Sequence, residues 1–397
     1  MDNLTNQQHK ILVLDANQRS ALASVRALGD LPQLTIYTAD STSQSLAGSS
    51  RYSARYLQCP SSETDPQAFL AWLTKAQASD QFSLVLPVTE ITSQLILLHH
   101  EQLPDVDLPF APLDTVMQLA DKSNLLALAK KLGFATPSSQ RYDSTATLDI
   151  SSLTYPLVLK PCQSTLYRDG AWVKTSVKVV KSEDELRAHL ARADYLKNSA
   201  FMIQAFIPGH GAGVFCLYHQ SEPILFFAHT RLREKPPEGG VSVLSESAKV
   251  NPALKILTEQ LMSAVNWHGV AMVEFRIAPD GTAYLMEVNT RFWGSLQLSI
   301  DAGANFPKHL VCLALNLPCE AITPYRTGQR LRWLLGDVDS LYLFLKSNRK
   351  LSSKISRLLS FFNPFSPKTK HEINRWNDLK PAIFEFKIYL KQLLGLD

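Results

Sequence analysis

Residues 270–291 read VAMVEFRIAPDGTAYLMEVNTR, two apolar stretches joined by the turn sequence APDG. This pattern predicts a β-hairpin. Because side chains alternate between the two faces of a strand, Glu287, Asn289 and Arg291 should project to the same side. Glu274 interrupts the apolar run AMVEF thirteen positions before Glu287, so it should lie on the partner strand. The hairpin is therefore expected to bring two carboxylates together.

Two neighbouring carboxylates need a cationic partner, because burying an uncompensated carboxylate costs on the order of several kcal/mol. Magnesium prefers oxygen ligands and usually takes one or two protein carboxylates together with nucleotide phosphates. Glu274, Glu287 and Asn289 are therefore candidate metal ligands. Arg291 offers a fork of donors suited to phosphoryl or acyl-phosphate oxygens. The alternative is a surface row of acids and arginines that pair with one another.

The segment over residues 286–307, MEVNTRFWGSLQLSIDAGANFP, closely resembles the magnesium-binding segment of ATP-grasp enzymes. This family includes biotin carboxylase, carbamoyl-phosphate synthetase and D-alanine–D-alanine ligase, and the Glu-x-Asn-x-Arg core carries the match. The resemblance spans roughly residues 10–330 and is strongest over 155–310. It implies ATP as the nucleotide, with Mg²⁺, or Mn²⁺ in its place, on the two glutamates and the asparagine. Arg291 then becomes a catalytic residue.

Upstream segments follow the order of the same family. The pattern over residues 116–133 predicts one continuous helix, and it contains the Asp121-Lys122 step, where relatives place a lysine that reaches the nucleotide phosphates. Lys160 ends the apolar strand pattern YPLVLKP, and the resemblance implies that it contacts ATP. The segment FMIQAFIPG resembles the hinge strand that holds adenine, which assigns Gln204 and Ile207 to the nucleotide.

The sequence departs from the family pattern at three places. Many relatives have a glutamate at the position of Gln204 and an acid near Gly211 that holds the ribose, and neither acid is present. The loop over residues 162–175, which would cover the phosphates, contains one glycine, Gly170, where relatives are glycine-rich. The residues that could replace its backbone donors are Ser164, Thr165 and Lys174.

Residues 229–247, HTRLREKPPEGGVSVLSES, place Arg231 and Arg233 before a double proline and a double glycine. Proline interrupts strand pairing, and glycine permits close backbone approach. The segment resembles the substrate loop of an ATP-grasp subgroup related to biotin carboxylase and carbamoyl-phosphate synthetase. This resemblance implies that the arginines face the reaction centre, with Arg233 as a catalytic residue. The alternative is an ordinary edge loop.

The expected fold class is α/β, with an α+β catalytic part. Strand and helix patterns alternate over residues 1–115, which predicts an N-terminal parallel α/β domain preceding the ATP-grasp part. The turn after the first strand has no glycine, so the GxGxxG dinucleotide fingerprint is missing. A two-lobed ATP-grasp domain should follow, with lobes over 116–200 and 201–330. Residues 331–397 are expected to form a basic, helical C-terminal extension, broken by the sequence NPFSP at residues 363–367.

The formal charge of +4 is unevenly distributed along the chain. Residues 341–397 carry eleven Lys and Arg against four Asp and Glu, a local charge of +7, which leaves −3 elsewhere. This distribution argues against nucleic acid as a partner. Apolar residues of the tail recur at helical spacing between basic ones, which predicts an amphipathic helix that either contacts membranes peripherally or packs on the catalytic domain. They are Leu351, Ile355, Leu358 and Phe362.

The N-terminus lacks the basic start and apolar core of a secretory signal, and no apolar run approaches the ~18 residues of a membrane span. We therefore expect a cytoplasmic protein. The five cysteines include no CxxC pair, which makes a zinc site or a disulfide framework improbable. A two-fold homodimer is the commonest arrangement for such enzymes.

The expected function is that of an ATP-dependent ligase that activates a carboxylate as an acyl phosphate and passes it to an amine-type nucleophile. Small-molecule carboxylates and amines are the expected partners. One alternative is bicarbonate as the activated carboxylate, which would yield a carboxylated or carbamoylated product. Another is an ATP-binding regulatory module without turnover.

Overall fold

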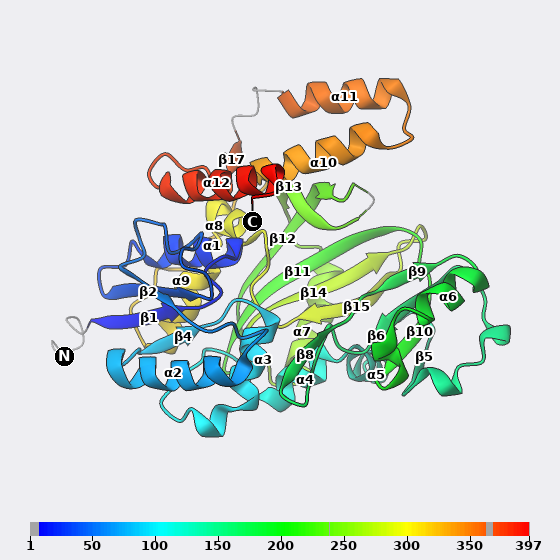
Figure 1. Cartoon of the computed structure of the whole chain (residues 1–397), viewed down its shortest axis with the longest axis horizontal. Helices are drawn as coiled ribbons and strands as arrows, with labels where there is room; N and C mark the ends of the chain where they lie inside the picture. The colour runs from blue at the N-terminus through cyan, green and yellow to red at the C-terminus, as the bar shows by residue number, and fades with distance from the viewer. Residues whose placement is uncertain (1–7, 238, 363–367, 397) are drawn as a thin grey trace.

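The computed structural model describes residues 8–237, 239–362 and 368–396 (Figure 1). Its first part is a four-stranded parallel sheet in the order β3-β2-β1-β4. These strands are β1 (His9–Val13), β2 (Leu34–Asp40), β3 (Arg55–Gln58) and β4 (Leu84–Leu86). The accompanying helices are α1 (Arg19–Leu28), α2 (Pro66–Asp80) and α3 (Glu90–Leu98). The expected N-terminal parallel α/β unit is confirmed.

Two helices follow, α4 (Leu113–Ala120) and α5 (Lys122–Lys131), where the sequence predicted one continuous helix. Asp121 separates them because its carboxylate accepts hydrogen bonds from the N–H groups of Ser123 and Asn124, which caps α5. Lys122 therefore occupies the first position of a helix.

The next sheet is antiparallel, in the order β5-β10-β6-β9, with the hairpin β7–β8 beside it. The strands are β5 (Ser139–Tyr142), β6 (Leu157–Pro161), β7 (Thr165–Arg168), β8 (Ala171–Lys174), β9 (Lys178–Val180) and β10 (Phe201–Ala205). Helix α6 (Glu183–Leu190) is capped by the preceding Ser182, whose hydroxyl accepts a hydrogen bond from the Glu185 N–H. Short 3₁₀ turns lie at His100–Gln102, Thr145–Thr147, Ile150–Ser152 and Asp194–Lys197.

The largest sheet has the order β15-β14-β11-β12-β13-β16-β17. Its first five strands are β11 (His210–His219), β12 (Glu222–Lys235), β13 (Val241–Ala248), β14 (Gly269–Ile277) and β15 (Ala283–Asn289). Helices α7 (Pro252–Ala264), α8 (Leu296–Ala302) and α9 (Phe306–Ala314) belong to the same part of the chain. The predicted hairpin is the antiparallel pair β14–β15.

The C-terminal part is helical, as expected, but it also contributes two strands to this sheet. Its helices are α10 (Leu334–Lys346), α11 (Leu351–Phe362) and α12 (Lys380–Leu394), and its strands are β16 (Arg330–Arg332) and β17 (Thr369–His371). Strand β16 pairs with β13, and β17 with β16. The three helices gather at one end of the molecule (Figure 1). The predicted NPFSP break lies outside the described residues.

One apolar cluster connects these parts. It includes Ile11 and Leu22 of the N-terminal unit, Phe215 of β11, and Phe292 and Trp293 just after β15. Arg26 of α1 reaches across to Asp378 in the C-terminal part, with Nε 2.8 Å from Oδ2. The end of β15 therefore lies where three separate segments of the chain meet.

Among the helices that the structure describes, none combines the length and the apolar character that a membrane span requires.

Candidate active site

The two carboxylates of the hairpin face each other. Glu274 is the direct cross-strand partner of Glu287, and Met272 that of Asn289. The amide Nδ2 of Asn289 donates to Glu274 Oε1 at 3.2 Å, and Arg291 Nη2 donates to Asn289 Oδ1 at 3.3 Å. The prediction that two carboxylates meet across the hairpin is confirmed, and Asn289 and Arg291 join them.

A buried lysine from the preceding sheet reaches the same pair. Lys160 lies on β6 with its side chain 6% exposed, and its Nζ is 3.3 Å from Glu287 Oε2 and 3.1 Å from the Met286 carbonyl. Lys122 is also buried and donates to Ser164 Oγ at 3.0 Å. An ammonium group resists burial unless an anion balances it. Glu287 balances Lys160, whereas the hydrogen bond of Lys122 goes to a neutral hydroxyl, so the two lysines together can accept a further anion.

Burial and neighbouring charges shift the pKa values of these groups in different directions. Burial lowers the pKa of Lys160, although Glu287 opposes that change. Burial, followed by repulsion from Glu287, raises the pKa of Glu274. Burial alone would raise the pKa of Glu287 as well, but Lys160, Lys122 and Arg291 together outweigh it and the pKa is lowered. The ionised form is thus favoured for Glu287, whereas the cations near Glu274 do not offset the effect of its burial.

A cavity of about 330 Å³ opens beside the carboxylates. Residues distant in sequence line it, among them Arg19, His229, Arg231, Arg291, Trp293 and Ser295. Nη2 of Arg231 is 3.5 Å from Glu274 Oε1. Arginines from α1, from β12 and from the segment after β15 therefore surround one space, which suits a substrate carrying negative charge.

Arg19 and His229 are site residues that the sequence interpretation missed. Arg19 begins α1, just beyond the carboxyl end of β1, the edge of a parallel sheet where ligands usually gather, and that position was the available signal. His229 Nε2 lies 3.0 Å from Ser295 Oγ. Burial, with the charge of Arg231 adding to it, lowers the pKa of His229 to about 3, so the imidazole is neutral near pH 7.

Arg233 does not belong to this site, and its predicted role facing the reaction centre is corrected. Along β12, Arg231 pairs with Ser245 and Arg233 pairs with Leu244, so Leu232 is an extra residue in a β-bulge. The bulge turns Arg233 to the opposite face of the sheet. There its Nη1 lies 2.6 Å from Asp337 Oδ2.

Two residues predicted to hold the nucleotide base, Gln204 and Ile207, lie in or just after β10. Gln204 is buried, and its Nε2 donates to Ser139 Oγ at 3.0 Å. Its Oε1 has no hydrogen-bond partner within the described ranges, which leaves one buried acceptor available. The Ile207 carbonyl accepts from Arg276 Nε at 3.2 Å.

Lys174 is not brought together with Lys122 and Lys160. It ends β8, and its Nζ lies 2.6 Å from Glu63 Oε1 of the N-terminal unit. It lines a separate cavity near the carboxyl ends of the parallel strands, together with Asp15 and Asp40. The hairpin β7–β8 contacts the N-terminal unit at a second point, where Trp172 Nε1 donates to the Ser62 carbonyl at 3.0 Å.

Part of the chain matches a known family and a known enzyme. The family model described as "ATP-grasp in the biosynthetic pathway with Ter operon" matches residues 197–336. A D-alanine–D-alanine ligase from Aquifex aeolicus (strain VF5) is 25% identical over 226 residues, which cover 51% of this chain and 72% of that protein.

Solved structures share the fold. An L-amino acid ligase from Bacillus licheniformis superposes with a TM-score of 0.61 at 19% identity, covering 78% of this chain and 75% of that one. The biotin carboxylase domain of 2-oxoglutarate carboxylase from Hydrogenobacter thermophilus, in complex with MgADP, ADP and bicarbonate, has a TM-score of 0.62 at 13% identity, with coverages of 82% and 74%. Residues 197–336 thus match an ATP-grasp family, and the chain shares its fold with ligases and carboxylases.

Proposed function

We propose that this protein is a ligase that uses ATP and Mg²⁺ to convert a small carboxylate into an acyl phosphate, and transfers the acyl group to an amine. ADP and phosphate are the other products. One observation carries the proposal: Glu274 and Glu287 oppose each other at the end of the hairpin, with the buried ammonium of Lys160 held against Glu287. Lys160 pairs with Glu287, while the contact of Arg231 Nη2 with Glu274 Oε1 is long at 3.5 Å, so the two carboxylates can take a further cation.

The residues present fit a magnesium ion. Within the described chain, no group of three or more His, Cys, Asp or Glu could hold a metal, but Mg²⁺ usually takes only one or two carboxylates and keeps several waters. Glu274 and Glu287 would hold it with the amide oxygen of Asn289, and Mn²⁺ fits the same donors. The bound ion would supply positive charge that neutralises phosphate oxygens during transfer.

The residues also fit ATP as the co-substrate. Lys122 and Lys160 would neutralise its phosphates. The free acceptor Gln204 Oε1 would receive a hydrogen bond from the adenine amino group, with Ile207 beside the ring. Gln204 thus replaces the glutamate that many relatives have at this position.

Phosphoryl transfer needs little covalent chemistry from the protein, because catalysis is mostly positioning and charge neutralisation. The substrate carboxylate would attack the terminal phosphorus, forming the acyl phosphate and releasing ADP. The amine would then attack the acyl carbon and expel phosphate. Arg291 and Arg231 would orient the carboxylate and stabilise the developing negative charge. Arg231 takes the role that the sequence assigned to Arg233.

An organic carboxylate is favoured over bicarbonate by the cavity of about 330 Å³, which lies in the volume range of small-molecule sites. Two relatives are named as ligases of amino acids, which supports an amine as acceptor. Bicarbonate, which is present in one structural relative, is the second candidate.

The test is magnesium-dependent ADP release across a panel of carboxylates, bicarbonate included, each with and without amines and amino acids. We expect release that requires both one carboxylate and an amine, and that is lost in Glu287→Gln. Release with bicarbonate alone would favour the carboxylating alternative. ATP binding without ADP release on any substrate pair would favour a regulatory module.

A further inference from the structure

A second charged cluster lies on the opposite face of the large sheet. Three arginines converge on Asp337, which is fully buried on α10. The distances to its carboxylate oxygens are 2.6 Å from Arg233 Nη1, 2.8 Å from Arg332 Nε and 2.7 Å from Arg357 Nη2. The three side chains are 14%, 15% and 10% exposed, in that order. One carboxylate balances one of three charges, which leaves a local excess of +2 in a largely desolvated place.

Part of this positive charge has no partner. Arg357 Nη1 and Arg332 Nη2 are buried and have no hydrogen-bond acceptor among the residues that the structure describes. Burial lowers the pKa of Arg233, and the charges of Arg357 and Arg332 lower it further, against the opposing effect of Asp337. Buried charge without compensation is costly, so the cluster is short of negative charge.

The other acids nearby are bonded elsewhere. Glu234 Oε1 lies 3.4 Å from Arg231 Nη1, on the active-site side. Asp339 forms an ion pair with Lys235 and accepts a hydrogen bond from the Tyr389 hydroxyl at 2.6 Å. Among the residues that the structure describes, a protein carboxylate therefore does not supply the missing charge.

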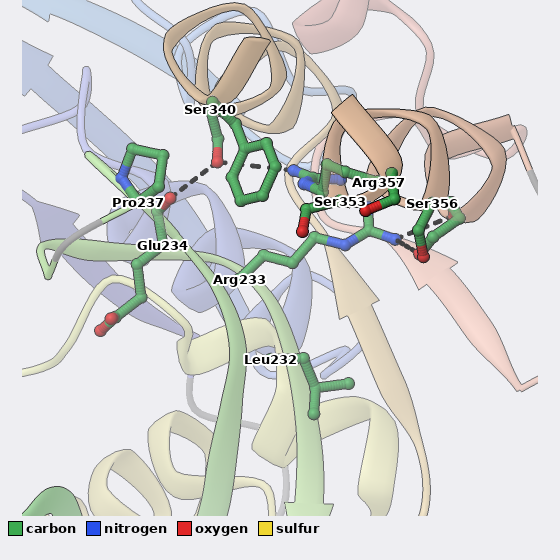
Figure 2. Close-up of a pocket in the computed structure, with 11 residues that line it drawn as sticks. Leu232, Arg233, Glu234, Pro237, Ser340, Ser353, Ser356 and Arg357 are labelled. Atoms are coloured by element: carbon green, nitrogen blue, oxygen red, sulfur yellow. Dashed lines mark hydrogen bonds between the residues drawn. The ribbon is translucent and has the colours of Figure 1, made fainter. Parts of the chain in front are cut away.

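A cavity of about 620 Å³ adjoins the cluster, and Arg233 and Arg357 line it (Figure 2). Figure 2 shows both side chains between the edge of β12 and α11, with Ser353 and Ser356 close by. Arg233 Nη2 already donates to Ser360 Oγ at 2.8 Å. Hydroxyl groups make up much of the remaining wall, from Ser340, Ser352, Ser353, Ser356 and Ser360. Guanidinium and hydroxyl groups together are the donors that hold phosphate oxygens.

We propose that this pocket binds a phosphate monoester, with the phosphate bridging Arg233 and Arg357 and accepting hydrogen bonds from the α11 serines. A monoester carries close to two negative charges at pH 7 and three acceptor oxygens, which match the excess of +2. Carboxylates and phosphodiesters carry one charge and would leave half of it unbalanced.

The monoester has two sources, a soluble metabolite or the headgroup of a lipid such as phosphatidic acid. The surface beside the pocket suits the lipid, because α11 exposes Leu351, Leu359 and Phe362, which are 72%, 69% and 68% exposed. Among the described residues after 340, the acidic side chains are buried or hydrogen-bonded within the protein. Glu372 and Asp378 are buried, and Glu385 accepts from Trp333 Nε1. The outer surface of the C-terminal helices is therefore apolar and basic.

The deciding variant is Arg357→Gln in the full-length protein, compared with Lys354→Gln. Asp337 keeps two arginines in Arg357→Gln, so folding should be preserved. Lys354 lies on the same helix outside the cavity lining, so its replacement removes an equal charge without changing the pocket.

The first arm measures thermal unfolding against inorganic phosphate and glycerol 3-phosphate, with chloride at equal ionic strength as reference. We expect the apparent affinity, obtained from the ligand-dependent shift of Tm, to fall about 10- to 100-fold in Arg357→Gln and to stay unchanged in Lys354→Gln. General salt effects and phosphate bound near Lys160 affect the wild-type protein and the two variants equally, so they cancel when the Tm shifts are compared.

The second arm is co-sedimentation with phosphatidylcholine vesicles containing phosphatidic acid, or phosphatidylglycerol at matched surface charge. Binding that prefers phosphatidic acid and depends on Arg357 would identify a lipid headgroup. A response to soluble phosphate that depends on Arg357, without such sedimentation, would identify a soluble ligand. If Arg357→Gln behaves like Lys354→Gln in both arms, the pocket does not bind phosphate and the proposal is wrong.

Discussion

Replacing Lys160 and Glu287, singly and together, distinguishes a working metal and phosphate site from an ordinary salt bridge. The two side chains join the sheet around β6 to the β14–β15 hairpin, 3.3 Å apart. We consider Lys160→Met, Glu287→Gln and the double variant, because each change keeps the side-chain length and removes the charge.

The expected stability changes follow from burial. Glu287→Gln leaves a lysine that is 6% exposed without its anion, and breaking a fully buried pair costs about 3–5 kcal/mol. Because Glu287 is 31% exposed, solvent screens part of that cost, and we expect about 1–3 kcal/mol for either single variant. The double variant lacks both charges, so it should regain about 1–2 kcal/mol relative to the sum of the single changes.

Activity should not follow stability. All three variants should release ADP about 100-fold more slowly, because each lacks a group that neutralises the transferring phosphate. The wild-type protein should gain about 2.7 kcal/mol of unfolding free energy at Mg·ADP concentrations 100 times the dissociation constant. The double variant should lose most of that gain. Urea unfolding with and without Mg·ADP, together with a coupled ADP assay, measures both quantities.

Glu183→Gln serves as the control, since Glu183 and Arg187 form an exposed pair on α6 and their separation should cost less than about 1 kcal/mol. A double variant that regains both stability and turnover would show that Lys160 and Glu287 are only a salt bridge. The assignment of metal and phosphate to this site would then be refuted.

Three further predictions concern single residues. Arg231→Gln should lower turnover at saturating ATP about 10- to 100-fold, because it removes a charged donor beside Glu274. The control Arg330→Gln breaks a partly exposed ion pair in the same sheet and should leave turnover unchanged. Equal rates of ADP release in the two variants would exclude Arg231 from the site. Gly294→Ala would place a methyl group 3.1 Å from Arg19 Nη2, so we expect a several-fold higher KM for the carboxylate with a smaller change in kcat, and an unchanged KM would contradict a substrate contact by Arg19. Burial raises the pKa of Glu385 from 4.5 to about 6, so the folded protein holds this proton more tightly than the unfolded chain. Stability should therefore fall by up to about 2 kcal/mol as pH rises through that window, and Glu385→Gln should remove this part of the pH dependence of Tm.

The sequence by itself determined the hairpin and its pair of carboxylates. Strand periodicity and a tight turn are local properties, and together they fix which residues stand opposite each other. The same local logic established the N-terminal parallel unit. A local signal was also present where the prediction was wrong, because Asp121 has the side chain that caps a helix, and the pattern was nonetheless interpreted as one continuous helix.

The tertiary structure decided what depends on contacts between distant segments. The bulge at Leu232 reverses the alternation on which the Arg233 prediction rested, and pairing with β13 reveals it. Arg19 and Arg231 lie more than 200 positions apart in the sequence, and they line one cavity because α1 packs against α8 and α9, the helices that follow β15. Three-residue strands such as β16 are too short to show periodicity, and they form only because a neighbouring strand supplies their hydrogen bonds. Periodicity thus predicts the faces of regular elements, whereas packing decides where a strand bulges, which faces meet and which charges are left without partners.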